Sequence, residues 1–292
     1  MSSIKRTNTS EEKNRTEGGT LYIVPTPIGN LADMTERALK VLSEVDFVAA
    51  EDTRNTGLLL SRFGISKPLV SYFEHNKRER GEVICKRLEA GESCAIVTDA
   101  GTPAISDPGE DLVRLCSEHG IPVTTLPGAC AAICALTLSA LPTGRFAFEG
   151  FLSTNKADRR KRLESLKHDP HTLIFYEAPH KLCGTLADMY EHFGDRKISL
   201  CRELTKLNEE VIRTTLSGAI THFEEVSPKG EFVLVIEGFD GEITEDISYP
   251  DDPEEHVQIF MNKGMKRMDA IKAAAAERGM NKREFYATLI EE

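Results

Sequence analysis

One stretch of the sequence organises the chain: Ala95-Ile96-Val97-Thr98-Asp99-Ala100-Gly101-Thr102-Pro103-Ala104-Ile105-Ser106-Asp107-Pro108-Gly109. Its first three residues are an apolar run, too short for a helix and followed at once by helix breakers, which predicts a buried strand. Two glycines and two prolines follow, and glycine lets bare backbone approach a ligand closely. Asp107 and Pro108, with Glu110 next, predict a helix start with Asp at the N-cap. The stretch therefore predicts a strand, a loop and a helix in succession.

This loop is neither of the common phosphate-binding loops, because the chain has no G-x-x-x-x-G-K-[ST] and its glycines are not spaced as G-x-G-x-x-G. Taken alone it is equally consistent with an ordinary connection between a strand and a helix. Similar loops at the ends of neighbouring strands are what favour a functional site.

Composition indicates a soluble protein with room for two domains: 292 residues, 40% of them hydrophobic. The most apolar segment, Ala129–Leu138, is about half the length of a membrane span. The seven cysteines are scattered and contain no C-x-x-C, so we expect reduced thiols in a cytoplasmic protein, with neither disulfides nor a metal site.

The net charge of −11 argues at first against a nucleic-acid partner. Eight acidic residues and no basic one lie between Asp240 and Glu255, however, and the rest of the chain is nearly balanced. It contains the basic run Lys156-Ala157-Asp158-Arg159-Arg160-Lys161-Arg162. We interpret its five basic residues, Lys156, Arg159, Arg160, Lys161 and Arg162, as RNA-binding candidates, the alternative being a solvated helix face.

The segmentation predicts five parts. They are a polar, disordered tail (1–19), an N-terminal parallel-sheet α/β domain (20–141), a second α/β domain (142–239), an acidic linker (240–255) and a helical module (256–292). In the first domain single helices separate the strands, which implies a largely parallel sheet whose strands end at one edge. The loops that begin at Pro25, Glu51, Glu74, Asp99 and Pro127 all fall on that edge, where such sheets bind ligands.

Helix boundaries are predicted from capping signals. Asp33 followed by Glu36 predicts the first helix start, and Asn281 followed by Glu284 predicts the last. Between Asn262 and Arg283 there are seven basic and two acidic residues. Short helices separated by a turn at Gly279 are typical of a helix-turn-helix-like module.

Five segments together resemble the tetrapyrrole-methylase-like family of S-adenosylmethionine (SAM) methyltransferases, and within it the enzymes that modify small-subunit ribosomal RNA. They are Pro25-Thr26-Pro27-Ile28-Gly29-Asn30-Leu31, Glu51-Asp52-Thr53-Arg54, the stretch from Thr98 to Gly109, Pro127-Gly128-Ala129 and Phe175-Tyr176-Glu177-Ala178-Pro179-His180-Lys181.

The resemblance implies 2′-O-methylation of a cytidine ribose in the decoding region of 16S rRNA, by a homodimer with SAM between its two α/β domains. The SAM contacts that it implies are Pro27, Ala100, Gly101, Thr102, Ile105, Cys130, Ala131, Tyr176, Glu177, Leu204 and Thr205. It does not imply the identity of the catalytic base.

The catalytic candidates at the sheet edge are Asp99, Arg54, Glu51, His75 and, from the second domain, Lys181. Carboxylates in loops are commonly N-caps or members of structural ion pairs, and that alternative applies to Glu51, Asp52 and Asp99. We expect Asp99 and Arg54 to contribute more to the rate than His75, by positioning the substrate. No metal is needed for such a displacement.

Two other functions fit the sequence less well. A methylase of the same fold that acts on a small molecule such as a tetrapyrrole would not need the basic run or the basic tail. A non-catalytic RNA-binding or ribosome-assembly protein would leave the glycine- and proline-rich loops without a role.

Overall fold

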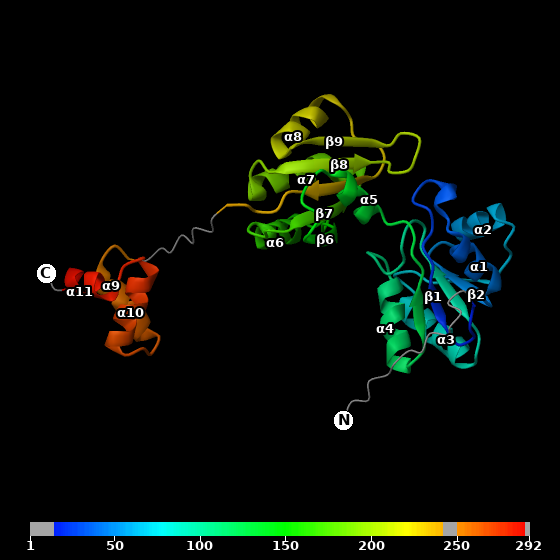
Figure 1. Ribbon diagram of the computed structural model, residues 1–292, viewed down its shortest axis with the longest axis horizontal. Helices are drawn as coiled ribbons and strands as arrows, with labels where there is room; N and C mark the ends of the chain where they lie inside the picture. Colours follow the sequence, from blue (N-terminus) through cyan, green and yellow to red (C-terminus); the bar gives the residue numbers. More distant parts are fainter. Residues whose placement is uncertain (1–14, 242–249, 290–292) are drawn as a thin grey trace. The chain divides into compact units, whose positions relative to one another are not determined.

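The computed structural model describes residues 15–241 and 250–289. The chain divides into two compact units, Met1–Phe239 and Asp240–Glu292 (Figure 1). Most of the predicted tail and the centre of the predicted acidic linker lie outside the described residues, so both remain predictions.

The first sheet has five parallel strands in the order β3-β2-β4-β1-β5. Its strands are β1 (Leu21–Ile23), β2 (Phe47–Ala50), β3 (Leu69–Ser71), β4 (Cys94–Val97) and β5 (Val123–Thr125). The sequence predicted a largely parallel sheet whose strands end at the loops that begin at Pro25, Glu51, Glu74, Asp99 and Pro127, and the parallel sheet is confirmed. The opening stretch thus supplies β4, at the centre of the sheet.

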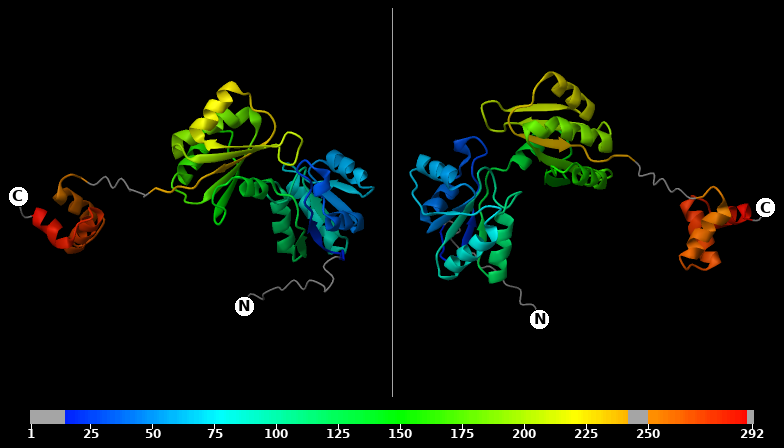
Figure 2. Two further views of the ribbon diagram at one scale, coloured as in Figure 1. Left: turned by 45° about the horizontal axis from the view of Figure 1, so that its top comes forward. Right: turned by 180° about the vertical axis from the view of Figure 1, so that it is seen from behind.

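Helices cover both faces of this sheet (Figures 1 and 2). They are α1 (Glu36–Glu44), α2 (Thr53–Arg62), α3 (Lys77–Glu89) and α4 (Gly109–His119), with a 3₁₀ turn at Leu31–Asp33. Side chains alternate along a strand, so Phe47 and Ala49 of β2 pack with α3 and α4, while Val48 and Ala50 pack with α1 and α2. Burial on both faces explains why the central strands β1, β2 and β4 are continuously apolar, whereas the edge strands β3 and β5 are only partly buried and contain Ser71, Thr124 and Thr125.

The second sheet is mixed, in the order β6-β7-β10-β8-β9, with only β6 and β7 parallel. Its strands are β6 (Phe146–Phe151), β7 (Thr172–Glu177), β8 (Lys197–Arg202), β9 (Glu210–Thr215) and β10 (Phe232–Ile236). Helices α6 (Lys156–Leu166), α7 (Pro179–Phe193) and α8 (Leu216–Glu225) pack on one face.

Helix α5 (Ala131–Leu138) covers the other face of the second sheet, where Ala132, Ala135 and Leu136 pack with residues of β7 and β10. The sequence prediction assigned this helix to the first domain, so that assignment is corrected. The boundary at 141 followed a Pro-Gly signal after the helix, whereas the helix docks through tertiary contacts that no local signal reveals.

The second unit contains three helices in its described part: α9 (Pro253–Asn262), α10 (Arg267–Glu277) and α11 (Lys282–Thr288). Their core is formed by Val257, Phe260, Ala270, Ile271, Ala274, Ala275 and Phe285. The predicted capping box at Asn281 and Glu284 is confirmed.

The predicted start of the first helix is wrong. Thr35, not Asp33, is the N-cap of α1, and its hydroxyl accepts a hydrogen bond from the backbone of Ala38. Both residues are capping types near Glu36, so the local sequence does not distinguish them. At the opening stretch, the Asp107 carboxylate accepts a hydrogen bond from Gly109 at 2.7 Å, and α4 begins one residue later than predicted.

Candidate active site

Hydrogen bonds connect the loops that follow β1, β4 and β5. Thr26 and Gly101 form an antiparallel bridge, in which each backbone N–H donates to the other residue's carbonyl, at 2.9 and 3.1 Å. The Thr26 hydroxyl also donates to the carbonyl of Thr98, and the Thr102 hydroxyl donates to that of Ala129. Three loops that are distant in sequence therefore form one rigid edge.

Gly101 presents bare backbone at this edge. Its φ of +86° is a conformation that side chains disfavour, and an added Cβ would lie 3.3 Å from the Ile28 side chain. Gly101, which the sequence predicts as a point where a ligand can approach the backbone, thus has a backbone conformation that favours glycine.

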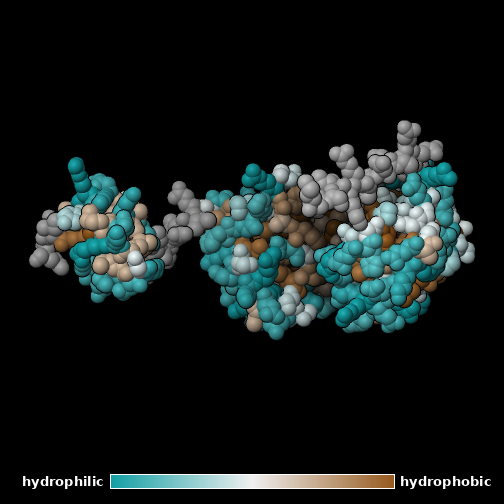
Figure 3. Space-filling view, turned by 90° about the horizontal axis from the view of Figure 1, so that it is seen from below, coloured by the Kyte–Doolittle hydropathy of each residue, from teal (hydrophilic) through white to brown (hydrophobic). Residues whose placement is uncertain are grey.

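A cavity of about 1080 Å³ opens beside this edge and is also lined by loops of the second sheet. Figure 3 shows apolar residues gathered in a hollow of the first unit. Substrate and cofactor pockets typically have volumes of about 300–1,000 Å³, so this one has room for a cofactor and part of a second substrate.

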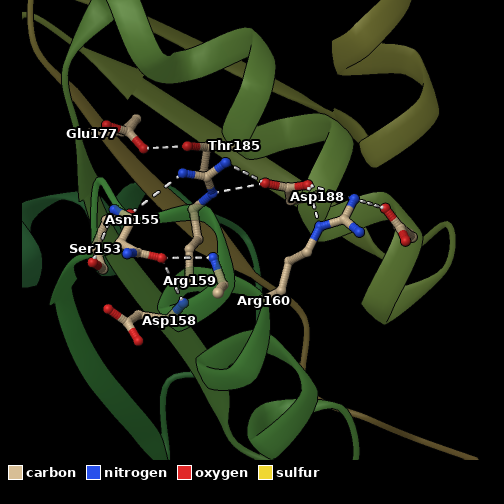
Figure 4. A network of polar contacts seen from close by, with 10 residues as sticks. Ser153, Asn155, Asp158, Arg159, Arg160, Glu177, Thr185 and Asp188 are labelled. Atoms are coloured by element: carbon tan, nitrogen blue, oxygen red, sulfur yellow. Dashed lines mark hydrogen bonds and ion pairs between the residues drawn. The ribbon is translucent and has the colours of Figure 1, made fainter.

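The loop after β7 forms part of the cavity wall. The Glu177 carboxylate is buried, accepting hydrogen bonds from the backbone N–H of Ala178 at 2.8 Å and from the Thr185 hydroxyl at 2.5 Å (Figure 4). Tyr176 lies beside it, and burial raises the pKa of its phenol to about 12. Glu177 thus holds its own loop against the start of α7, and the Tyr176 phenol stays neutral.

The hairpin loop after β8 contributes Glu203, Leu204 and Lys206. The Lys206 ammonium lies 2.9 Å from the carboxylates of Glu203 and Glu231, which fixes the base of the loop. An added Cβ on Gly29, in the loop after β1, would lie 2.4 Å from the Lys206 side chain. The loops of the two sheets therefore meet at Gly29.

The cavity lining is strongly acidic, with nine carboxylates against two lysines. Lys77 is paired with Glu74 and Asp111, and Lys206 is paired as described. The surplus of negative charge favours a cationic ligand and disfavours phosphate groups inside the cavity.

Glu51 and Asp99 lie in this acidic lining. The Asp99 carboxylate accepts a hydrogen bond from the Asn55 amide at 3.1 Å, and Glu51 accepts one from the Thr98 hydroxyl at 3.2 Å. Burial raises the pKa of Glu51, and the neighbouring Asp99 and other carboxylates raise it further, against the lowering effect of the Thr98 hydrogen bond. Glu51 is therefore a better proton acceptor than an ordinary glutamate.

The structure brings most of the predicted site residues together around the large cavity: Glu51, Asp99, Ala100, Gly101, Thr102, Ile105, Cys130, Ala131, Tyr176, Glu177 and Leu204. Pro27 lines a smaller cavity of about 170 Å³ that also touches Asp99. Their contacts with SAM remain predictions.

Arg54, His75, Lys181 and Thr205 are outside the set of described residues that line the large cavity. Arg54 is 87% exposed and paired with Asp52 at 2.7 Å, and Asp52 is the N-cap of α2. Asp52 is therefore an N-cap and a member of an ion pair, which is the structural alternative that the sequence left open. His75 is exposed and its ring contacts that of Phe73 edge-on.

The basic run on α6 is largely neutralised (Figure 4). Arg159 and Arg160 both bind Asp188 of α7, at 2.6 and 3.2 Å, and Arg162 binds Glu149. The Asp188 side chain is only 7% exposed. RNA binding by the five basic residues of this run stays a prediction, but three of them are paired with carboxylates. The sequence does not show this pairing, because Asp188 is 29 and 28 residues away from Arg159 and Arg160. Lys156 and Lys161 are exposed, and among the described residues they form no ion pair.

Several cavity residues were missed by the sequence analysis: Ile28, Lys77, Ser106, Glu110, Asp111, Phe151, Glu203, Lys206, Glu231 and Val233. Phe151, Glu231 and Val233 belong to the second sheet or its connections, where the sequence pattern is that of an ordinary core. Only the sheet pairing brings them to this site.

In the part of the chain that the structure describes, no group of three or more His, Cys, Asp or Glu side chains is arranged to hold a metal ion. Nor does any helix in the described ranges have the length and apolarity needed to cross a membrane.

Residues 20–220 match the model of the tetrapyrrole (corrin/porphyrin) methylases. The chain therefore belongs to this family, and the predicted α/β fold class is confirmed. It is 46% identical over 274 residues to the ribosomal RNA small subunit methyltransferase I of Synechocystis sp., covering 94% of this chain and 98% of that protein. It is 47% identical to the protein of the same name from Bacillus subtilis, covering 93% of this chain and 94% of that one.

Solved structures with the same fold are more distant in sequence. Uroporphyrin-III-C-methyltransferase from Thermus thermophilus is 20% identical with a TM-score of 0.55, covering 75% of this chain and 94% of that one. A diphthine synthase is 14% identical with a TM-score of 0.57, covering 75% and 90%. At these identities the similarity supports the fold alone.

Proposed function

We propose that the protein transfers the methyl group of SAM to the 2′-oxygen of a cytidine ribose in the decoding region of 16S rRNA. The observation that carries this proposal is 46–47% identity, over more than nine tenths of the chain, to methyltransferases named for small-subunit ribosomal RNA. The cavity between the loops of the two sheets provides a site for the chemistry.

The cavity residues fit SAM. Bare backbone at Gly101 allows close approach of the adenosyl group, and the acidic lining favours a sulfonium cation. SAM, when bound, supplies an activated methyl group. Ala100, Thr102, Cys130 and Ala131, with the Tyr176–Glu177 loop and Leu204, would hold it, and Pro27 and Thr205 are proposed at the margin.

The remaining work falls to residues of the chain. They align the ribose hydroxyl and accept its proton, and alignment provides the larger share of the acceleration. Asp99, held by Asn55, is proposed as the group that orients the ribose. Glu51, with its raised pKa, is proposed as the proton acceptor. Arg54, His75 and Lys181, which lie outside the cavity lining, are assigned secondary roles.

RNA binding is proposed for exposed cations that have no acidic partner among the described residues. On α6 these are Lys156 and Lys161. In the second unit they are Lys263, Lys266, Lys272, Lys282 and Arg283. Phosphate contacts by such side chains provide affinity outside the acidic cavity.

The two alternative functions require different features of the protein. A small-molecule methylase would not require the unpaired cations of the second unit, and a non-catalytic RNA-binding protein would not require the cavity. The family resemblance also supports a homodimer that acts on ribosomal RNA in the cytoplasm. Light scattering that returned the mass of a single chain would contradict the dimer.

The test is transfer of tritiated methyl groups from SAM to small ribosomal subunits isolated from cells that lack this modification. We expect labelled 16S rRNA, and much less label with the Gly101→Val protein when SAM is subsaturating. Label transferred only to a tetrapyrrole, or to neither acceptor, would contradict the proposal.

A further inference from the structure

Phe151 lies at the end of β6 and lines the cavity, yet 58% of it is exposed. Its ring contacts that of Tyr176 edge-on at 5.4 Å, and Tyr176 also contacts Phe148 at 5.0 Å. Covering an exposed aromatic ring removes apolar area from water, so a half-exposed ring in a cavity wall offers an apolar contact surface to a ligand.

A β-bulge gives Phe151 this position. The pairing of β6 with β7 shifts register between Phe148 and Gly150, and Gly150 has a φ of +63°. Bulges redirect side chains and occur next to active sites. Arg162 binds Glu149 at 2.6 Å, which fixes the bulge from α6. This arginine of the basic run therefore has a structural task.

The bulge also meets the opening stretch of the first sheet. An added Cβ on Gly150 would lie 3.3 Å from the hydroxyl of Ser106. Ile105, the neighbour of Ser106, lines the same cavity and is 43% exposed. Exposed apolar side chains from both sheets thus flank one junction at the cavity wall.

The negative charge of the cavity limits which part of a ligand can bind against this apolar wall. Nine lining carboxylates would repel phosphate groups, so an RNA nucleotide that entered this cavity would insert its base and sugar and keep its phosphates outside. Enzymes that act on one nucleotide commonly extrude it and stack its base on aromatic or apolar side chains.

From this geometry, and resting on the proposed function, we propose that Phe151, with Ile105 in the lining of the same cavity, forms the stacking surface for the base of the target nucleotide. The surface binds the RNA substrate and not SAM. Phe151 is thus a substrate-positioning residue for the methyl transfer.

The chain contains no tryptophan, so Phe151→Trp introduces a single fluorescent reporter at this surface. We expect oligocytidylate to quench its emission, and an abasic oligonucleotide of equal length to leave it unchanged. Phe146→Trp is the matched control, because Phe146 lies on the same strand with 42% exposure but outside the cavity lining. Equal quenching of both proteins, or quenching by the abasic strand, would overturn the proposal.

Kinetics provide the second measurement. Phe151→Ala should lower kcat/KM for small-subunit RNA by about tenfold to a hundredfold, the range for loss of one stacked base, with SAM affinity unchanged by calorimetry. Phe151→Tyr should restore most of the loss, and Phe146→Ala should behave as wild type. Wild-type activity in Phe151→Ala, or weakened SAM binding, would overturn the stacking assignment. Failure of the wild-type protein to methylate RNA would instead overturn the proposed function.

Discussion

The Glu51 carboxylate lies in the cavity lining and accepts a hydrogen bond from the Thr98 hydroxyl. As a loop carboxylate it had the same standing as Asp52, but Asp52 caps a helix and pairs with Arg54, whereas Glu51 lies in the cavity lining with a raised pKa. A group that accepts a proton must be unprotonated, so the rate should fall as the pH falls through this raised pKa.

Glu51→Gln removes the proton acceptor and keeps the side-chain shape. We expect kcat to fall by about a hundredfold or more, and the acidic limb of the pH–rate profile to disappear. Asp99→Ala should also cost more activity than Arg54→Ala or His75→Ala, because Asp99 alone of these three lines the large cavity. A His75→Ala loss greater than that of Glu51→Gln, with SAM and RNA affinity preserved, would reverse the assignment.

Asp188 is the shared partner of Arg159 and Arg160, so replacing it tests whether these two arginines stabilise the fold. Burial raises the pKa of this carboxylate, but hydrogen bonds and charge from Arg159 and then Arg160 outweigh burial and hold the pKa below its ordinary value. A carboxyl group whose pKa is lowered by folding stabilises the folded state at pH values above its ordinary pKa. That stabilisation is lost as the pH falls through the folded-state pKa.

Asp188→Asn should therefore lower the free energy of unfolding by about 3 kcal/mol at pH 7, because two arginines lose a buried partner. The difference from wild type should shrink below pH 4. Glu191→Gln is the control, since it removes only a 55% exposed partner of Arg160 and should cost less than about 1 kcal/mol. Equal costs for the two variants in urea denaturation would contradict the structural interpretation.

Among the helices and strands, the parallel sheet could be predicted because its central strands are short apolar runs and each strand is followed by a distinctive loop. The placement of α5 could not be predicted, since seven of its eight residues are apolar and the helix could pack on either sheet. Phe151 was missed for a related reason, because a bulge at Gly150 cannot be distinguished from a regular strand without its partner.

The loop after β4 is the element on which cofactor binding depends. Gly101→Val introduces a side chain at a φ of +86° and beside Ile28, so we expect SAM affinity to fall at least tenfold while the protein remains folded. Gly64→Val is a suitable control, because Gly64 has a similar φ of +70° but nothing within 4 Å of its added Cβ. Unchanged affinity in calorimetry with folded Gly101→Val protein would refute this placement of SAM.

The helices of the second unit are proposed to contact RNA phosphates. Replacing Lys266, Lys272 and Lys282 with Ala should weaken RNA binding and flatten its salt dependence, because fewer counterions are released. SAM affinity should not change. Replacing Arg159 and Arg160 instead should mainly destabilise the fold, since these side chains bind Asp188. Unaltered affinity and salt slope in the triple-lysine variant would remove the second unit from the RNA contact.

At the scale of the whole molecule, the sequence predicted a site between two α/β domains, and the structure has loops of both sheets around one acidic cavity. The charge of that cavity comes from residues in several separate segments of both sheets, so it emerges only when the sheets are assembled. Net charge alone pointed away from RNA, whereas the assembled molecule separates an acidic cavity from exposed cations.

We expect the protein to methylate a ribose of 16S rRNA in this cavity. The most direct measurement is mass spectrometry of nucleosides released from unmodified small subunits after incubation with the protein and SAM. We predict 2′-O-methylcytidine in the decoding region, formed by wild type and lost in Glu51→Gln. Methylation of a base, or of no nucleoside while the protein still binds SAM, would contradict the account.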